Sequence, residues 1–524
     1  MRPDSSQPCQ DGRVTMPAKE DSPSPVPGQT SPTQARWAGL AGTTLVAVGA
    51  VGAGVLPRPD PLAHTPLRLL RDGLGLELSI AMAALGMLLW VAAWWSLRRA
   101  GDYSTRWMTI TAALWALPLA LTPPLLSRDV YSYAAQGQSA AHGLNPYEHG
   151  PADLGSDWLT STSPSWYHSH APYGPLFVGV ARLSAALGDA TGHLEVAIFA
   201  LRLITVAAVA LLAAYLPRLA KACGVDPARA QWLGLASPLL LAHSVAGVHQ
   251  DVIMIALLVA GLAYVAERQP ILGGLFLGAA IAIKAPAIVV FPFSALLTWL
   301  PGSRPLRLAW LHPVQLVATC AASLIALTLV AGFGWGWVDA LRVPGDSVQW
   351  TSVPTSWGMA AGWLVHPASA WTLPGSDDTA LSVARAVGTG LLAITLIANW
   401  GNAARRVFTS RRAEAPAETV RLIVRGAGLA LLALVLLAPA FHPWYFLWPL
   451  VLLSASLRQP QGITVLSIAA AALCFLVLPD GYNLARATLV PGALAVVAAT
   501  LTLACVALIR LRRQRIRRRY QESA

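Results

Sequence analysis

The chain alternates long apolar runs with short polar connections. Most of the runs hold about 17–25 residues, the length that a helix needs to cross the hydrocarbon of a bilayer. Because backbone polar groups find no water inside lipid, each run is expected to be helical. We therefore predict an all-α polytopic membrane protein with about 14 transmembrane helices. The predicted helices span 37–57, 76–97, 107–126, 195–217, 230–246, 251–267, 270–283, 285–300, 311–333, 380–400, 421–441, 444–457, 461–478 and 487–509.

The two ends of the chain are polar. Residues 1–36 are rich in Pro, Ser, Gln and Asp and predict a disordered cytoplasmic tail, too long and polar for the start of a signal peptide. Residues 37–509 are predicted to form the transmembrane domain, and residues 510–524 a basic cytoplasmic tail.

The placement of Arg and Lys predicts the orientation, because these residues concentrate in short cytoplasmic loops. Fourteen crossings with both termini in the cytoplasm place five basic clusters on the inside. These are the clusters at Arg98/Arg99/Arg106, Arg218/Lys221/Arg229, Arg304/Arg307, Arg405/Arg406/Arg411/Arg412 and Arg510–Arg519. Arg58, Arg68 and Arg71 fall outside in this scheme and do not follow the rule.

The same count of crossings leaves two long extracytoplasmic loops, 127–194 and 334–379. Within the first, the apolar stretch 172–188 cannot cross without reversing a neighbour, so a re-entrant or juxtamembrane helix is predicted there. Both loops are rich in Trp, Tyr, His and Pro, and loops of this length are usually functional or disordered. The predicted location is the plasma membrane, with the active site extracytoplasmic.

Composition excludes several soluble classes. Of the 524 residues, 55% are hydrophobic and only 12% are charged, against about 25% charged in soluble proteins. The net charge of +12 would suit nucleic acid, but the loop and tail positions of the basic residues argue against that partner. The five cysteines show no paired spacing, and no nucleotide-binding motif occurs. No cofactor and no metal site are expected, and an activated group would arrive on a lipid carrier.

One polar segment follows the third helix directly: Ser127 to Gly137. If the segment is helical, Asp129, Tyr133 and Gln136 share one face, and Asp129 could accept a proton from an attacking hydroxyl. An apolar rim would raise the pKa of this carboxyl. The alternative is an N-capping Asp beside interfacial tyrosines. The following segment, Gly143–Tyr147, which includes Asn145, reads as a turn.

Ionisable residues inside apolar runs are functional candidates. Lys284 is the only Lys in such a run, and its alternative is a snorkelling side chain; for Arg202 the alternative is a structural ion pair. The junction His249–Gln250–Asp251 must line a cavity or face water. The segment containing His442, Trp444 and Tyr445 is either an aromatic belt or a sugar platform.

Taken in order, these segments, with the Tyr173–Gly174–Pro175 step and Ile283–Pro286, resemble the actinobacterial polyprenol-phosphomannose-dependent α-1,6-mannosyltransferases, the MptA/MptB group of the C-type glycosyltransferase superfamily. The likeness covers about residues 37–510, and 37–62 looks closer to MptB. Gln250 departs from the Asn that the family pattern leads us to expect. The resemblance implies an outer-face cavity, a polyprenyl-phosphate mannose donor, and an α-1,6-mannan acceptor of lipomannan-like glycolipids.

The resemblance also implies roles for residues. Asp129 would be the general base of an inverting transfer. The donor phosphate would be bound by Arg128, Arg202, Lys284 and His442. Sugar or acceptor contacts would come from Tyr131, Tyr133, Gln136, Asn145, Tyr147, Tyr173, His249, Gln250, Asp251, Trp444 and Tyr445.

Three other interpretations stay open. Broken helices with intramembrane Lys284 and Arg202 would also suit a lipid-linked sugar transporter or flippase. A polyprenyl-phosphate-sugar transferase could carry another sugar, such as arabinose or glucose, because nothing in the residues identifies the hydroxyl pattern. A structural membrane scaffold would leave the outer motifs unexplained.

Overall fold

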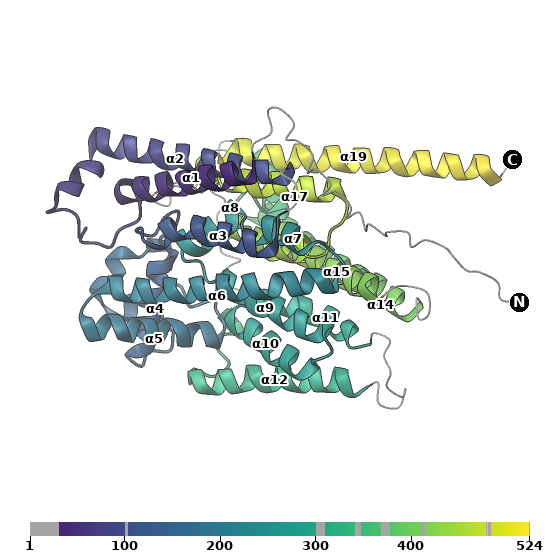
Figure 1. Ribbon diagram of the computed structural model, residues 1–524, viewed down its shortest axis with the longest axis horizontal. Helices are drawn as coiled ribbons and strands as arrows, with labels where there is room; N and C mark the ends of the chain where they lie inside the picture. Colours follow the sequence, from purple (N-terminus) through teal and green to yellow (C-terminus); the bar gives the residue numbers. More distant parts are fainter. Residues whose placement is uncertain are drawn as a thin grey trace, which may run out of the picture.

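The chain forms a bundle of long helices, drawn in Figure 1 from a computed structural model. The structure describes residues 31–99, 103–299, 310–340, 347–367, 378–409, 416–477, 479 and 484–522. Within these ranges the regular structure is helical, with no β-strand. The predicted all-α class is confirmed.

The helix bounds follow the apolar runs closely. The first half contains α1 (Pro32–Ala53), α2 (Gly73–Ser96), α3 (Thr105–Ala120), α4 (Asp129–Ala141), α5 (Pro175–Thr191), α6 (Leu194–Ala222), α7 (Pro227–Gly234), α8 (Pro238–Leu241) and α9 (Asp251–Ala266). The second half contains α10 (Pro270–Ile283), α11 (Phe291–Leu297), α12 (Leu311–Ala331), α13 (Val353–Val365), α14 (Thr379–Thr409), α15 (Pro416–Leu437), α16 (Leu447–Ser454), α17 (Pro460–Leu473), α18 (Leu484–Ala487) and α19 (Leu489–Glu522).

Proline marks many of the helix starts. Five helices within the first three hundred residues begin at a proline: Pro32, Pro175, Pro227, Pro238 and Pro270. Its fixed φ suits the helix, and the N–H that it lacks would have no partner in the first turn. The sequence therefore sets these boundaries locally, before any tertiary contact.

Several helices are long and apolar enough to cross a membrane. Among the described residues these are α2, α6, α12, α14, α15 and the Leu489–Arg510 part of α19. A further pair, Pro238–Ala246 with Asp251–Ala266, meets the same test together but bends by 120°. Four shorter apolar helices, of 10–17 residues, accompany them. Apolar side chains stand exposed along α14, for example Ile397 at 72%, as lipid-facing residues do. The chain is thus a multi-pass membrane protein.

The predicted run 230–246 is not one continuous helix. It contains α7, the single turn α8 and a π-helical turn, Ala242–Ala246. The runs 285–300 and 444–457 likewise begin with a 3₁₀ turn before α11 and α16. Each interruption lies beside a proline or a polar group, which the apolar pattern alone does not register.

The predicted tails have different outcomes. Residues 1–30 lie outside the described part of the chain, and α1 already begins at Pro32. Arg304, Arg307, Arg411 and Arg412 also lie outside the described residues. At the other end, α19 continues as a helix through the basic segment to Glu522, and Figure 1 shows it projecting beyond the bundle.

The loop 127–194 contains α4, three short 3₁₀ helices and α5. The apolar stretch 172–188 forms α5, which packs against α4, α6, α10 and α12. The loop between α1 and α2 lies at the same end of the bundle (Figure 1). The backbone N–H of Arg58 donates to Ser161 Oγ at 2.8 Å, joining the two loops directly.

Arg71, one of the three basic residues that did not follow the orientation rule, has a local structural role. Arg71 pairs with Asp60 at 2.6 Å and donates to the Val51 and Gly52 carbonyls, both at 3.0 Å. A cation at a helix C-terminus compensates the unpaired carbonyls there. Arg71 therefore serves the end of α1 and says nothing about the side of the membrane.

Candidate active site

Asp129 is the first residue of α4. The N-cap position belongs to Arg128, whose side chain makes no capping bond, so the alternative of an N-capping Asp129 is not what the structure shows. The Trp166 indole N–H donates to Asp129 Oδ1 at 3.2 Å. Oδ2 lies 3.8 Å from His249 Nδ1, and the Asp129 side chain stays 17% exposed. The indole thus holds one carboxylate oxygen, while the side chain as a whole remains partly exposed.

The electrostatic setting of Asp129 suits a base that works near neutral pH. Burial raises the pKa of this carboxyl to about 6, while hydrogen bonds from Trp166 and Ser127 oppose the rise. The predicted rise is confirmed. At pH 7 the group is mostly ionised, yet it is basic enough to take a proton from a hydroxyl as a bond forms.

The inward face of α4 continues the cluster. Tyr133, one turn beyond Asp129, has its Oη 3.4 Å from His249 Nδ1 and its ring against Tyr173 and Phe177. Gln136 follows on the same face and is buried, and neither atom of its amide has a hydrogen-bond partner among the described residues. The predicted shared face of Asp129, Tyr133 and Gln136 is therefore formed, and it points inward.

A sharp bend brings the His249–Gln250–Asp251 junction to this face. The π-helical turn ends at Ala246, and α9 begins at Asp251. Between them, Val248 adopts φ 56°, a left-handed conformation that costs a β-branched residue strain and often marks a functional site. All three junction residues are buried, and the Gln250 amide has no hydrogen-bond partner among the described residues. The bend thus presents buried polar groups with unused bonding capacity.

Lys284 and Asp251 form a buried ion pair. Lys284 ends α10, and its Nζ lies 2.8 Å from Asp251 Oδ1. Trp448 Nε1 donates to the same oxygen at 2.7 Å, while Asp251 Oδ2 has no partner in the described structure. The Lys284 ammonium also lies 4.4 Å from the ring centre of Tyr445 and 5.2 Å from that of Trp448. Lys284 does not snorkel; two aromatic rings and a carboxylate hold it.

A row of rings connects this cluster to His442. Trp444 stacks between His249, at 4.0 Å between ring centres, and His442, at 4.7 Å. His442 Nδ1 is 3.2 Å from Gln349 Nε2, which lies between α12 and α13. The aromatic segment is therefore part of the polar cluster and not only a belt at the lipid interface.

Other predicted residues are bound to the scaffold. Tyr131 Oη donates to the Val55 carbonyl at 2.7 Å, and Arg128 donates to the carbonyls of Leu56 and Ser161 at 3.3 and 3.1 Å. These contacts fix the start of α4 to the α1–α2 loop, so both side chains support the position of Asp129.

Arg202, Asn145 and Tyr147 also have local partners. Arg202 donates to the carbonyls of Ala120, Thr122 and Ala246, which ties α6 to the end of α3 and to the bend. Asn145 bonds to Glu148 and to the backbone N–H of Tyr147, as the predicted turn requires. No carboxylate pairs with Arg202 in the described structure. The alternative role predicted for Arg202, a structural ion pair, is therefore not formed, and the guanidinium binds backbone carbonyls instead.

Four site residues were not predicted: Trp166, His243, Gln349 and Trp448. His243 lies inside an apolar run, and its ring centre is 5.4 Å from that of His249; the rule applied to Lys284 and Arg202 could have found it. Trp448 belongs to the aromatic segment already noted. Trp166 and Gln349 lie in loops without a motif, and only the fold brings them to the site.

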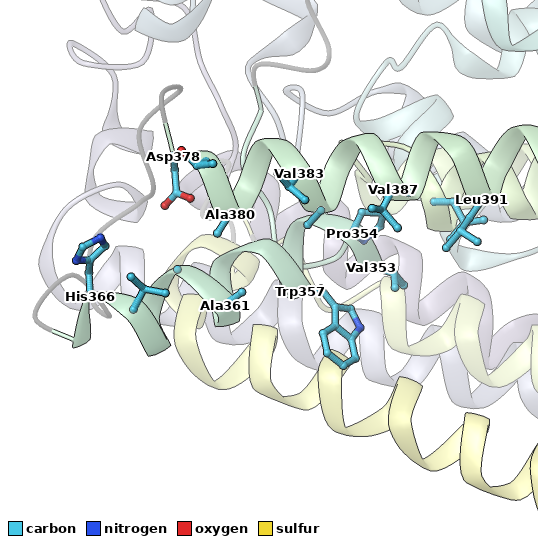
Figure 2. A pocket seen from close by; sticks show the side chains of 16 residues that line it. Val353, Pro354, Trp357, Ala361, His366, Asp378, Ala380, Val383, Val387 and Leu391 are labelled. Atoms are coloured by element: carbon cyan, nitrogen blue, oxygen red, sulfur yellow. The ribbon is translucent and has the colours of Figure 1, made fainter.

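A separate cavity of about 880 Å³ lies between α13 and α14 (Figure 2). Its lining is largely apolar, with Val383, Val387 and Leu391 along α14 and with His366 and Asp378 at one end. None of its lining residues belongs to the polar cluster around Asp129. The cavity therefore adds no group to the candidate chemistry.

Comparison with known proteins gives two family matches. Residues 36–300 match the family description "Alpha-(1->6)-mannopyranosyltransferase, N-terminal domain", and residues 354–509 match "MptB C-terminal domain". The chain is 32% identical to Alpha-(1->6)-mannopyranosyltransferase A of Mycobacterium tuberculosis, over 84% of each chain. It is 27% identical to Alpha-(1->6)-mannopyranosyltransferase B of Corynebacterium glutamicum, over 86% of this chain and 77% of the relative. The polar cluster lies within the two matched regions except for Gln349.

Proposed function

This chain belongs to the alpha-(1->6)-mannopyranosyltransferase family, MptA/MptB, and from that membership we propose that it transfers mannose from polyprenyl-phosphate mannose to an α-1,6-mannan acceptor of lipomannan-like glycolipids. The chain is an enzyme, a glycosyltransferase, and its residues 354–509 are MptB-like. The donor, the acceptor, the stereochemistry and the side of the membrane are the proposal.

One observation carries the proposal: the carboxylate of Asp129 faces a wall of buried polar groups, and its side chain stays 17% exposed. In the transfer, the acceptor hydroxyl oxygen forms a bond to the anomeric carbon of mannose. The bond from that carbon to the phosphate oxygen breaks, and polyprenyl phosphate leaves with the electron pair. Asp129 accepts the hydroxyl proton. A single displacement inverts the anomeric centre, so a β-linked donor yields an α link.

The leaving phosphate needs positive charge or hydrogen-bond donors close by. Lys284 and His442 lie in the same cluster as Asp129 and are the groups we assign to the phosphate. Arg128 adjoins Asp129 but donates to two loop carbonyls, and Arg202 donates to three carbonyls, so we assign both to holding the site in shape.

The sugars would meet the remaining buried groups. A mannose unit offers hydroxyls that donate and accept, which matches the unpartnered amides of Gln136 and Gln250 and the free oxygen of Asp251. Aromatic rings provide flat apolar faces for the sugar ring. We assign this role to Tyr133, Tyr173, Trp444 and Tyr445.

We further propose that the site is extracytoplasmic, with both termini in the cytoplasm and about 14 crossings. The loop 127–194 contacts the α1–α2 loop through Ser161 and Arg58, so the two lie on one side of the membrane. The basic end of α19 favours the cytoplasm. A polyprenyl tail could then stay in the bilayer while its head reaches Asp129.

The direct experiment incubates purified protein with polyprenyl-phosphate mannose and a short α-1,6-mannoside. We expect an acceptor longer by one or more α-1,6-linked mannoses, determined by linkage analysis. Polyprenyl-phosphate arabinose and polyprenyl-phosphate glucose serve as comparison donors, tested under the same conditions as polyprenyl-phosphate mannose. Transfer from either of these in preference to mannose would overturn the donor assignment, and movement of labelled lipid across vesicles without transfer would indicate a flippase.

A further inference from the structure

The indole of Trp166 touches the carboxylate proposed as the base. Its N–H donates to Asp129 Oδ1 at 3.2 Å, whereas Oδ2 lies toward His249, 3.8 Å from Nδ1. The two oxygens therefore have different neighbours. One is engaged by a donor that never carries a charge, and the other faces the inner wall of the site.

The loop that carries Trp166 is held by its own backbone. The Trp166 N–H donates to the Ser163 carbonyl at 2.9 Å, and Tyr167 accepts from the Ala152 N–H at 2.9 Å. A Cβ added at Gly150 would come within 2.6 Å of the His168 Cα, so the two ends of this loop lie in close contact. The Trp166 ring centre lies 6.4 Å from that of Tyr173 on the floor of the site. The backbone of the loop that carries the indole is therefore held by contacts of its own.

We propose that Trp166 is a positioning residue of the transfer reaction: its indole N–H holds Oδ1 of Asp129 so that Oδ2 is aimed at the acceptor hydroxyl. This inference rests on the proposed role of Asp129 as the base. It adds to the site a residue of the segment between α4 and α5.

The indole bond also affects when Asp129 is ionised. Burial raises the pKa of this carboxyl, and the indole bond lowers it by stabilising the charged form. The other titratable groups around the carboxyl are Tyr133, Tyr173, His249, Asp251, Lys284 and Tyr445. The indole that donates to Oδ1 carries no charge, so a change at Trp166 acts on the carboxyl without removing a charge.

The sign of the effect follows. A base works only when ionised, so the rate falls as the pH drops below the pKa of Asp129. Without the indole donor the pKa rises further, and the acid limb of kcat/KM moves to higher pH. One hydrogen bond to a charged group corresponds to a shift of about one pH unit. Activity near pH 6 should therefore fall about fivefold more than activity near pH 8, and activity near pH 5 about tenfold more.

The test is Trp166→Phe in the full chain, with kcat/KM measured from about pH 5 to 9 on polyprenyl-phosphate mannose and a short α-1,6-mannoside. The matched control is Trp158→Phe, a tryptophan of the same loop whose ring lies against Gly188 instead of Asp129. We expect the acid limb to shift upward in Trp166→Phe and to stay in place in Trp158→Phe. An unshifted limb in Trp166→Phe, with activity retained, would overturn the inference.

A double variant separates this inference from the proposed function. If Trp166 acts through Asp129, then Trp166→Phe should change the residual rate little in an Asp129→Asn background. An equal loss in both backgrounds would mean that the indole acts elsewhere, for example on the sugar. Should Asp129→Asn alone keep near-parent activity, the base assignment itself fails, whatever Trp166→Phe does.

Discussion

Replacing Lys284 by Met leaves the carboxylate of Asp251 buried with one remaining hydrogen-bond donor, Trp448 Nε1. Asp251 is fully buried, and the Lys284 side chain is only 9% exposed. The attraction of the pair at 2.8 Å is about 6 kcal/mol at an effective dielectric constant of about 20. Much of this is offset by the loss of hydration of both charges. Removing one partner of a buried pair typically costs about 3–5 kcal/mol.

The two single substitutions should not be equal. Asp251→Asn leaves the Lys284 ammonium over the rings of Tyr445 and Trp448, at 4.4 and 5.2 Å, and a desolvated cation–π contact contributes about 2 kcal/mol. In Lys284→Met, the Asp251 carboxylate gains no comparable contact to replace the lost ion pair. We therefore expect Lys284→Met to lower stability more than Asp251→Asn, and the double variant Lys284→Met/Asp251→Asn to recover most of the loss.

The assay measures the apparent melting temperature of the purified protein in detergent, with size-exclusion chromatography as the readout of the folded fraction. Transfer activity is measured on the same samples. Recovery of stability in the double variant without recovery of activity would show that the pair serves the reaction as well as the fold. Equal or reversed losses in the single variants, or a double variant no more stable than Lys284→Met, would refute the reasoning about this pair.

Three further outcomes are expected. The pH profile of kcat/KM should be level above about pH 7 and should fall about tenfold per pH unit below pH 6, because burial raises the pKa of Asp129 to about 6 and only the ionised form accepts a proton; a profile level down to pH 4.5 would contradict this. Cysteine at the exposed Asp157, with Cys9 and Cys505 replaced by Ser, should react with an impermeant maleimide in intact cells, whereas cysteine at the exposed Lys221 should react only after permeabilisation; the opposite pattern would reverse the topology. Arg202→Met should lower the melting temperature and leave the KM for the donor unchanged, because its guanidinium binds the Ala120, Thr122 and Ala246 carbonyls; a raised donor KM at unchanged stability would return Arg202 to the phosphate site.

The long helices could be predicted because lipid makes the pattern simple. A run of apolar residues in a bilayer has few alternatives to a helix, and proline at the first helical residue sets several of the boundaries. The bend at Ala242–Ala246 was missed since the run 230–246 stays apolar through it. His243 is buried within this bend, and Val248, with φ 56°, follows it directly.

In the candidate site, too, local patterns in the sequence predict some features and tertiary contacts determine the others. Asp129, Tyr133 and Gln136 could be placed on one face because helix periodicity is local. Lys284 stood out as an ionisable residue in an apolar run, but its partner Asp251 is 33 positions away, and no pattern in the sequence pairs them. The contact of Trp166 with Asp129 depends on the path of an irregular loop, which the sequence does not determine locally. Local rules therefore find the reacting groups, and tertiary structure determines what holds them.

The central claim is that Asp129 is the base, and the most direct measurement is turnover of Asp129→Asn. Asparagine keeps the shape and can still accept the Trp166 indole bond, but it cannot take a proton. With polyprenyl-phosphate mannose and a short α-1,6-mannoside, we expect the variant to fold, to bind the lipid donor, and to lose turnover by about 10²–10⁴-fold. Transfer at close to the parent rate would contradict the claim and direct attention to His249 and Asp251 instead.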